Sequence, residues 1–195
     1  MRHRAGGQGR KPRSWCDIRG HLRLTKPSER DCQPIGPATG PCTVQTVRFF
    51  AVGTNMDEEL LRSWIPSARR LTIASLSGFM LRWHKRSSDG GKLAALRTGH
   101  PDDVVWGVVY EVDGLGWQQI DEGQRAAGYR DERVTVVGPD GAEHDASVYV
   151  ARAEMIDDSM MPTRSYRDPI VNGARANGLP AEYVDELART PVADS

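Results

Sequence analysis

The chain has 195 residues, enough for one compact domain with a substantial core, and its 26 basic and 26 acidic residues cancel. Its three cysteines are odd in number and show no CxxC or Cys/His ligand spacing, which argues against a disulfide framework and a zinc site. No run approaches the roughly 18 apolar residues of a membrane span, so we expect a cytoplasmic protein without membrane contact.

The N-terminal residues 1–45 are rich in Gly, Pro, Arg and Ser and lack a sustained apolar period. Residues 1–46 carry nine Lys and Arg against three Asp and Glu, a net charge of +6. A nucleic-acid-binding arm would fit this charge, but Trp15 is the only aromatic side chain there that could stack on a base, and a transit peptide fits loosely. We favour a disordered basic extension, or a translation start assigned too far upstream, for residues 1–45. One domain is expected over residues 46–190, and no nucleic-acid partner is expected.

From Val47 onward the pattern predicts seven strands. They cover residues 47–52, 70–74, 79–84, 92–96, 104–112, 129–137 and 143–152. Residues 104–112 are apolar on both faces, as in a central strand. The sequence Gly138-Pro139-Asp140-Gly141 between the last two strands is a hairpin signal.

Helices are predicted after Asn55, over 115–121, from Asp168 to Gly178 and from Pro180 to Leu187. Asn55 can cap the first, with Glu58 in the capping-box position. Pro169 suits the first position of a helix capped by Asp168. No repeating βαβ unit appears, so we expect an α+β fold with an antiparallel or mixed sheet, curled towards a barrel.

Four stretches could carry chemistry, each with an ordinary structural alternative. The glycine turn at 53–56 could hold an anion on free N–H groups, or simply start a helix. An acid at 120–130, or Glu111 nearby, could move a proton, or be solvated at a helix end. Three tyrosines could line a cleft or finish a core; they are Tyr129, Tyr149 and Tyr166. Residues 82–92 look phosphate-friendly but lack Walker spacing, and no metal-ligand cluster is evident.

These elements, in this order, resemble the gamma-glutamylcyclotransferase family from about Val47 to Leu187. The resemblance rests on FFAVGTNM, FMLRWHKRSSDGGK, VWGVVYEVD, IDEGQRAAGYR and PTRSYRDPIVNGARANGLPAEYVDEL. It implies a small mixed, partly closed β-barrel with flanking helices. It also implies cleavage of a small γ-glutamyl or amino-acid-derived substrate to 5-oxoproline and an amine or amino acid, without metal or organic cofactor.

The resemblance also implies site residues. The substrate's glutamyl part would lie on the turn formed by Val52, Gly53, Thr54, Asn55 and Met56, although the family usually has tyrosine at the position of Val52. In the family, the glutamate that accepts and returns the proton is followed at once by glycine and, seven residues on, by tyrosine. Glu122-Gly123 and Tyr129 meet that spacing, so Glu122 would be the general base and acid. Tyr129 and Tyr166 would line the pocket.

A rival register remains to be weighed. The family has a Leu-Asp-x-x-Glu pattern, and anchoring it on Ile120-Asp121 would put Gln124 at the catalytic position, where no proton can be taken near neutral pH. We prefer Glu122, because the rival register loses Gly123 and shifts Tyr129. The alternative function is a non-catalytic ligand-binding protein on the same fold. The sequence gives no indication of oligomeric state.

Overall fold

The computed structural model describes residues 45–193, and the predictions for the N-terminal extension concern residues outside this range. Its strands are β1 (Thr46–Ala51), β2 (Arg69–Ser77), β3 (Phe79–Lys85), β4 (Lys92–Arg97), β5 (Val104–Asp113), β6 (Tyr129–Val137) and β7 (Glu143–Ala151). Its helices are α1 (Glu58–Trp64), α2 (Gly114–Ala126), α3 (Arg164–Ala176) and α4 (Ala181–Arg189), with short 3₁₀ turns η2 (Thr54–Met56) and η3 (Ala153–Met155). All seven predicted strands are present, with ends shifted by at most a few residues.

The strands form one mixed sheet that closes into a small barrel. Its order is β1-β5-β2-β6-β7-β4-β3, and a further parallel pairing of β1 with β7 at Phe49 and Ser147 closes a ring of five strands. Strands β4 and β3 extend the sheet beyond β7, with β4 parallel to β7 and β3 antiparallel to β4. The predicted α+β fold with a mixed barrel is therefore confirmed.

Two core layers follow from the alternation of side chains along the strands. One cluster takes residues from all five barrel strands, with one each from β3 and β4 and none from a helix, so it fills the barrel interior; Phe50, Val109 and Val148 belong to it. The neighbouring positions Phe49 and Tyr110 belong to a second cluster, which also holds the buried residues of the helices. This second cluster is the layer between the barrel and its helices.

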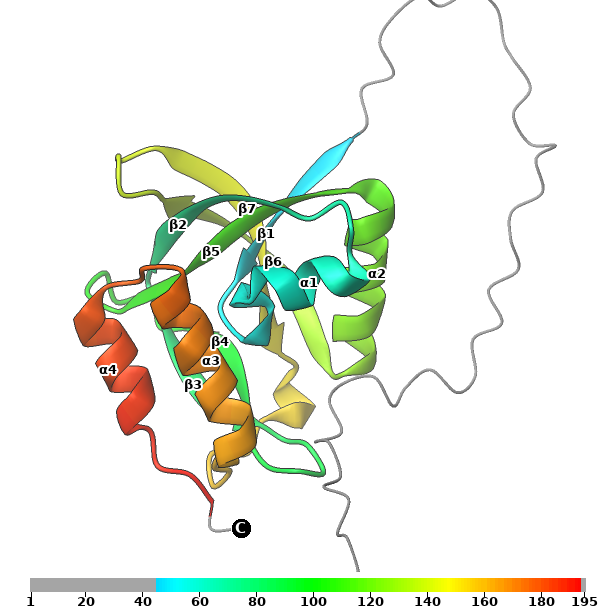
Figure 1. Cartoon of the computed structure of the whole chain (residues 1–195). Coiled ribbons are helices and arrows are strands. Elements are labelled where there is room, and N and C mark those ends of the chain that lie inside the picture. The colour runs from blue at the N-terminus through cyan, green and yellow to red at the C-terminus, as the bar shows by residue number, and fades with distance from the viewer. Residues whose placement is uncertain (1–44, 194–195) are drawn as a thin grey trace, which may run out of the picture. The chain divides into compact units, whose positions relative to one another are not determined.

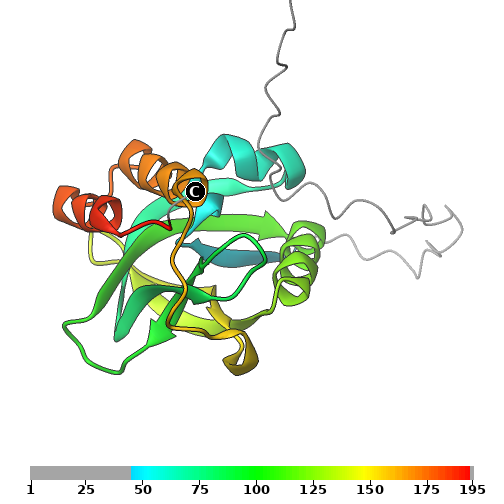
Figure 2. The same cartoon turned by 90° about the horizontal axis from the view of Figure 1, so that it is seen from below.

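The helices cover the barrel from several sides (Figures 1 and 2). Helices α3 and α4 lie side by side, and α2 lies on the other side of the barrel from α4. Between η3 and α3 the chain runs along the β3–β4 hairpin, where the N–H of Gly91 donates to the carbonyl of Met161 at 2.8 Å. No helix within residues 45–193 has the length and apolar character needed to cross a membrane.

Two predicted helix starts are wrong. Asp57, not Asn55, caps α1, and its carboxylate accepts a hydrogen bond from the N–H of Leu60 at 3.0 Å. Helix α3 begins at Arg164, so Pro169 lies inside the helix instead of at its first position. Proline there removes one backbone hydrogen bond, and the turn before it gains packing instead, because Tyr166 meets Trp83 edge to face at 6.1 Å between ring centroids.

Candidate functional site

The glycine turn after β1, Gly53–Met56, is fixed by hydrogen bonds to its last carbonyl group. The carbonyl of Met56 accepts hydrogen bonds from the Tyr110 hydroxyl at 3.0 Å and from the side-chain amide of Asn177 at 2.8 Å. Asn177 ends α3, and a Schellman motif with Gly178 at φ +74° fixes that end. The buried strand β5 and the end of α3 therefore fix the position of the turn.

The first three residues of the turn offer backbone N–H groups as free hydrogen-bond donors. Within the described residues, no hydrogen bond is found from the N–H groups of Gly53, Thr54 or Asn55. A side chain at Gly53 would meet nothing within 4 Å, so packing does not demand glycine there. An open glycine beside unpaired N–H groups suits the close approach of a carboxylate.

Val52 stands apart from the rest of the turn. It is partly buried and packs against the barrel-interior cluster, whereas Met56 belongs to the layer under the helices. Val52, at the position expected from the resemblance to hold tyrosine, therefore packs on the barrel interior and not on the layer under the helices.

The structure brings Tyr129 and Tyr166 together around the backbone of one residue, Leu93. The Tyr129 hydroxyl donates to the carbonyl of Leu93 at 2.9 Å, and the Tyr166 hydroxyl accepts from the N–H of Leu93 at 3.4 Å. Burial raises the pKa of Tyr166 to about 12 and that of Tyr129 well above its ordinary value. Both hydroxyls are therefore neutral hydrogen-bonding groups at physiological pH.

Asp121 is the carboxylate of α2 that faces the core layer. Its Oδ1 accepts from the Tyr149 hydroxyl at 3.1 Å, and its Oδ2 accepts from Arg125 at 2.6 Å. Trp117, one turn earlier, stacks on the Tyr149 ring at 6.0 Å between centroids. In the sequence, Asp121 is only one of the acids within residues 120–130. Its partner Tyr149 lies on β7, too far along the chain for local patterns to connect them.

Glu122 lies on the side of α2 opposite the buried Ile120. Ile120 is fully buried, and at 100° per residue Glu122 is about 200° further round the helix. The Glu122 side chain is exposed, and its Oε1 accepts from Gln118 at 2.7 Å. Gln124, one turn after Ile120, is partly buried on the inward side. The structure thus brings Tyr129, Tyr166 and the turn into the core layer but leaves Glu122 outside it.

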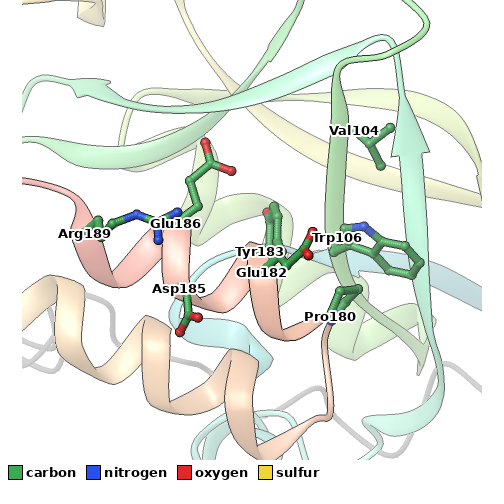
Figure 3. Close-up of a pocket in the computed structure, with 8 residues that line it drawn as sticks. All are labelled: Val104, Trp106, Pro180, Glu182, Tyr183, Asp185, Glu186 and Arg189. Carbon is green, nitrogen blue, oxygen red and sulfur yellow. The ribbon is translucent and has the colours of Figure 1, made fainter.

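Two surface hollows lie away from these residues. One, of about 500 Å³, lies between α4 and the start of β5 and is lined by Trp106, Pro180 and acidic residues of α4 (Figure 3). The other, of about 300 Å³, lies along β1 and β5 near Arg48 and Glu111. Neither is lined by the glycine turn or by α2. Within residues 45–193, no three His, Cys, Asp or Glu side chains gather as metal ligands would.

Comparison with known proteins adds a consistent set of relatives. A sequence model described as the AIG2-like family matches residues 104–187. The chain is 30% identical over 162 residues to a protein named gamma-glutamylcyclotransferase from Homo sapiens, covering 76% of this chain and 80% of the relative. A Bos taurus protein of the same name is 31% identical over 153 residues, covering 71% and 76%. A solved structure named gamma-glutamyl cyclotransferase superposes with a TM-score of 0.71 at 28% identity, covering 77% of this chain and 91% of that structure.

Proposed function

Because the chain belongs to the gamma-glutamylcyclotransferase family and is an enzyme of that type, we propose that it cleaves a γ-glutamyl amide by cyclisation. The substrate's own α-amine attacks the γ-carbonyl carbon and forms the new C–N bond. A carboxylate takes the proton from that amine and passes it to the leaving nitrogen as the old amide bond breaks. The products are 5-oxoproline and a free amine or amino acid, and no water is consumed.

The observation that carries this proposal is the turn at Gly53–Met56. Its N–H groups are unpaired at the front, and Tyr110 and Asn177 fix it from behind through the Met56 carbonyl. Rigid donors of this kind can hold the glutamyl carboxylate and so fix the attacking amine near the γ-carbonyl. Family membership also leads us to expect a cytoplasmic role in glutathione metabolism.

Two carboxylates of α2 are candidates for the proton transfer. Spacing supports Glu122, since Gly123 and Tyr129 follow it as in the family. Position supports Asp121, which lies at the core layer beside Tyr149, whereas Glu122 would have to turn about the helix axis to reach it. General acid–base catalysis is worth roughly a hundred- to ten-thousand-fold in rate. Loss of the working carboxylate should therefore be unmistakable.

The test uses the full chain with γ-glutamylalanine and measures 5-oxoproline. Glu122→Gln and Asp121→Asn each replace one carboxylate by its amide and keep its shape. If Glu122 moves the proton, Glu122→Gln loses turnover and Asp121→Asn keeps most of it; if Asp121 does, the pattern reverses. Full turnover by Glu122→Gln would refute the role that the family spacing gives to Glu122.

A second candidate function is supported by Gln124 and Val52. If Gln124 occupies the place of the family's glutamate, the same fold would bind γ-glutamyl compounds without cleaving them. That alternative predicts calorimetric binding of γ-glutamylalanine with no 5-oxoproline, equally in wild type, Glu122→Gln and Asp121→Asn. Restoring a glutamate by Gln124→Glu would then create turnover.

A further inference from the structure

The two lysines among residues 45–193 both point inward, which is unusual for this residue type. Lys85 is only 5% exposed, and the Lys92 side chain is 12% exposed. Lysine is almost never buried unless it is paired. The other basic side chains of the described region are arginines and histidines, so the positive charge of the surface comes from those residues and not from lysine. The placement of these two lysines therefore needs its own explanation.

Lys85 and Lys92 also lie directly opposite each other. They are register partners across the antiparallel β3–β4 pair, a placement at which like charges repel. Lys92 is neutralised by Asp89, with its Nζ 2.9 Å from the carboxylate. No ion pair or side-chain hydrogen bond of Lys85 is found within the described residues. The pair thus has one positive charge without a matching anion.

The unmatched charge lies beside the tyrosines of the candidate site. The Lys85 ammonium is 5.3 Å from the centroid of the Tyr129 ring, and the Lys92 ammonium is 4.1 Å from that of Tyr166. Burial and the charge of Lys92 lower the pKa of Lys85, while Asp89 opposes the shift. The Tyr166 hydroxyl, which accepts from Leu93, has its own proton available to a ligand.

This group of side chains lies about one substrate's length from the glycine turn. Tyr166 and Gly173 are two turns apart on one face of α3, roughly 10 Å, and Gly173 packs on the Met56 side chain. Seven bonds separate the two carboxyl carbons of a γ-glutamyl dipeptide, about 8 Å when extended. A dipeptide held at the turn by its glutamyl part can therefore place its far carboxylate near Lys85.

We propose that Lys85, with Lys92 and the Tyr166 hydroxyl, forms a subsite for the carboxylate of the amino acid that is released. This inference rests on the proposed cyclisation and assigns the residues that would recognise the released amino acid. Lys85 supplies the charge, and the Tyr166 hydroxyl adds a neutral donor. Lys85 is then a specificity residue that has no part in the proton transfer.

The test compares γ-glutamylalanine with γ-glutamylethylamine, which differs only by the missing carboxylate. We expect wild type to prefer γ-glutamylalanine in kcat/KM by roughly ten- to a hundredfold, as a charge-assisted bond implies. Lys85→Met should abolish that preference, mainly through KM. Arg82→Met removes an exposed cation from the same strand and should keep it. Lys92→Met gives a second variant of the subsite should Lys85→Met fail to fold.

A second measurement needs no turnover. Acylation of Lys85 by an amine-reactive reagent, followed by mass spectrometry, should be blocked by γ-glutamylalanine and not by γ-glutamylethylamine. If neither compound gives 5-oxoproline, the proposed function fails, and this protection alone decides the subsite. Equal protection by both compounds, or an unchanged preference in folded Lys85→Met, would overturn the subsite whether or not cyclisation occurs.

Discussion

The Tyr149 hydroxyl on β7 donates a hydrogen bond to Oδ1 of Asp121 on α2, at 3.1 Å. The same carboxylate accepts from Arg125, which also donates to Asp131 at 2.6 Å. Burial, followed by the negative charge of Asp121, raises the pKa of Tyr149 far above its ordinary value. The tyrosine therefore stays protonated and keeps donating, so the Asp121 carboxylate is fixed in orientation.

Removing that hydroxyl should weaken the attachment of α2 to the barrel. Tyr149→Phe keeps the ring that stacks on Trp117 and loses only the hydrogen bond to Asp121. We expect the free energy of unfolding to fall by about 1 kcal/mol, measured by urea denaturation. Asp121→Asn and the double variant complete a cycle; strictly additive losses would show that the two groups do not interact.

The Gly53–Met56 turn should depend on Asn177. Asn177→Ala removes the amide that bonds the carbonyls of Met56 and Gly173, each at 2.8 Å. We expect a loss of roughly 1–2 kcal/mol in stability and a raised KM, because the turn is less rigid. Asn172→Ala, an exposed asparagine on the same helix, is the matched control. A larger effect of the control on KM would contradict this role of Asn177.

The tyrosines should resist ionisation in the folded protein. Burial is the main cause that raises the pKa of all five, to about 12 for Tyr110 and Tyr166. The tyrosines of the unfolded chain ionise near their ordinary pKa of 10.0, so the native state binds more protons above that pH. The stability that depends on the protonated tyrosines is thus fully present below pH 10 and is lost as pH rises towards 12. A phenolate absorbance titration should show little change near pH 10 and then a rise that coincides with unfolding.

Lys85 should destabilise the empty protein at neutral pH. Its pKa is lowered in the folded state, so the unfolded chain binds more protons and stability rises with pH through that lowered pKa. Lys85→Met should therefore raise stability at pH 7, and the gain should shrink as pH approaches 10.5. Thermal melts across pH test this. The exposed Arg82→Met should show no such pH-dependent gain.

Local sequence patterns predicted the strands better than the helices. The hairpin of β6 and β7 matches prediction at nearly every boundary because Gly138–Gly141 determines its turn and alternation determines its faces. The start of α3 was wrong because Tyr166 gains contacts with Trp83 on a distant strand, which stabilise a turn before Pro169. Tertiary contacts of this kind leave no local signal.

The candidate site divides in the same way. The position of the glycine turn could be predicted because its residues are consecutive, whereas Tyr110 and Asn177, which hold it, come from elsewhere in the chain. The inward face of α2 could not be predicted, since glycines interrupt its period and Leu115 is largely exposed. The packing of Ile120 decides that face and separates Asp121 from Glu122.

The most direct test of the central claim is 5-oxoproline release from γ-glutamylalanine by wild type, Glu122→Gln and Asp121→Asn, with binding measured in parallel. We predict that wild type releases 5-oxoproline and alanine in equal amounts and that one of the two variants loses at least a hundredfold in rate while still binding. Binding without product in wild type, or equal turnover in all three proteins, would contradict a cyclotransferase driven by a carboxylate of α2.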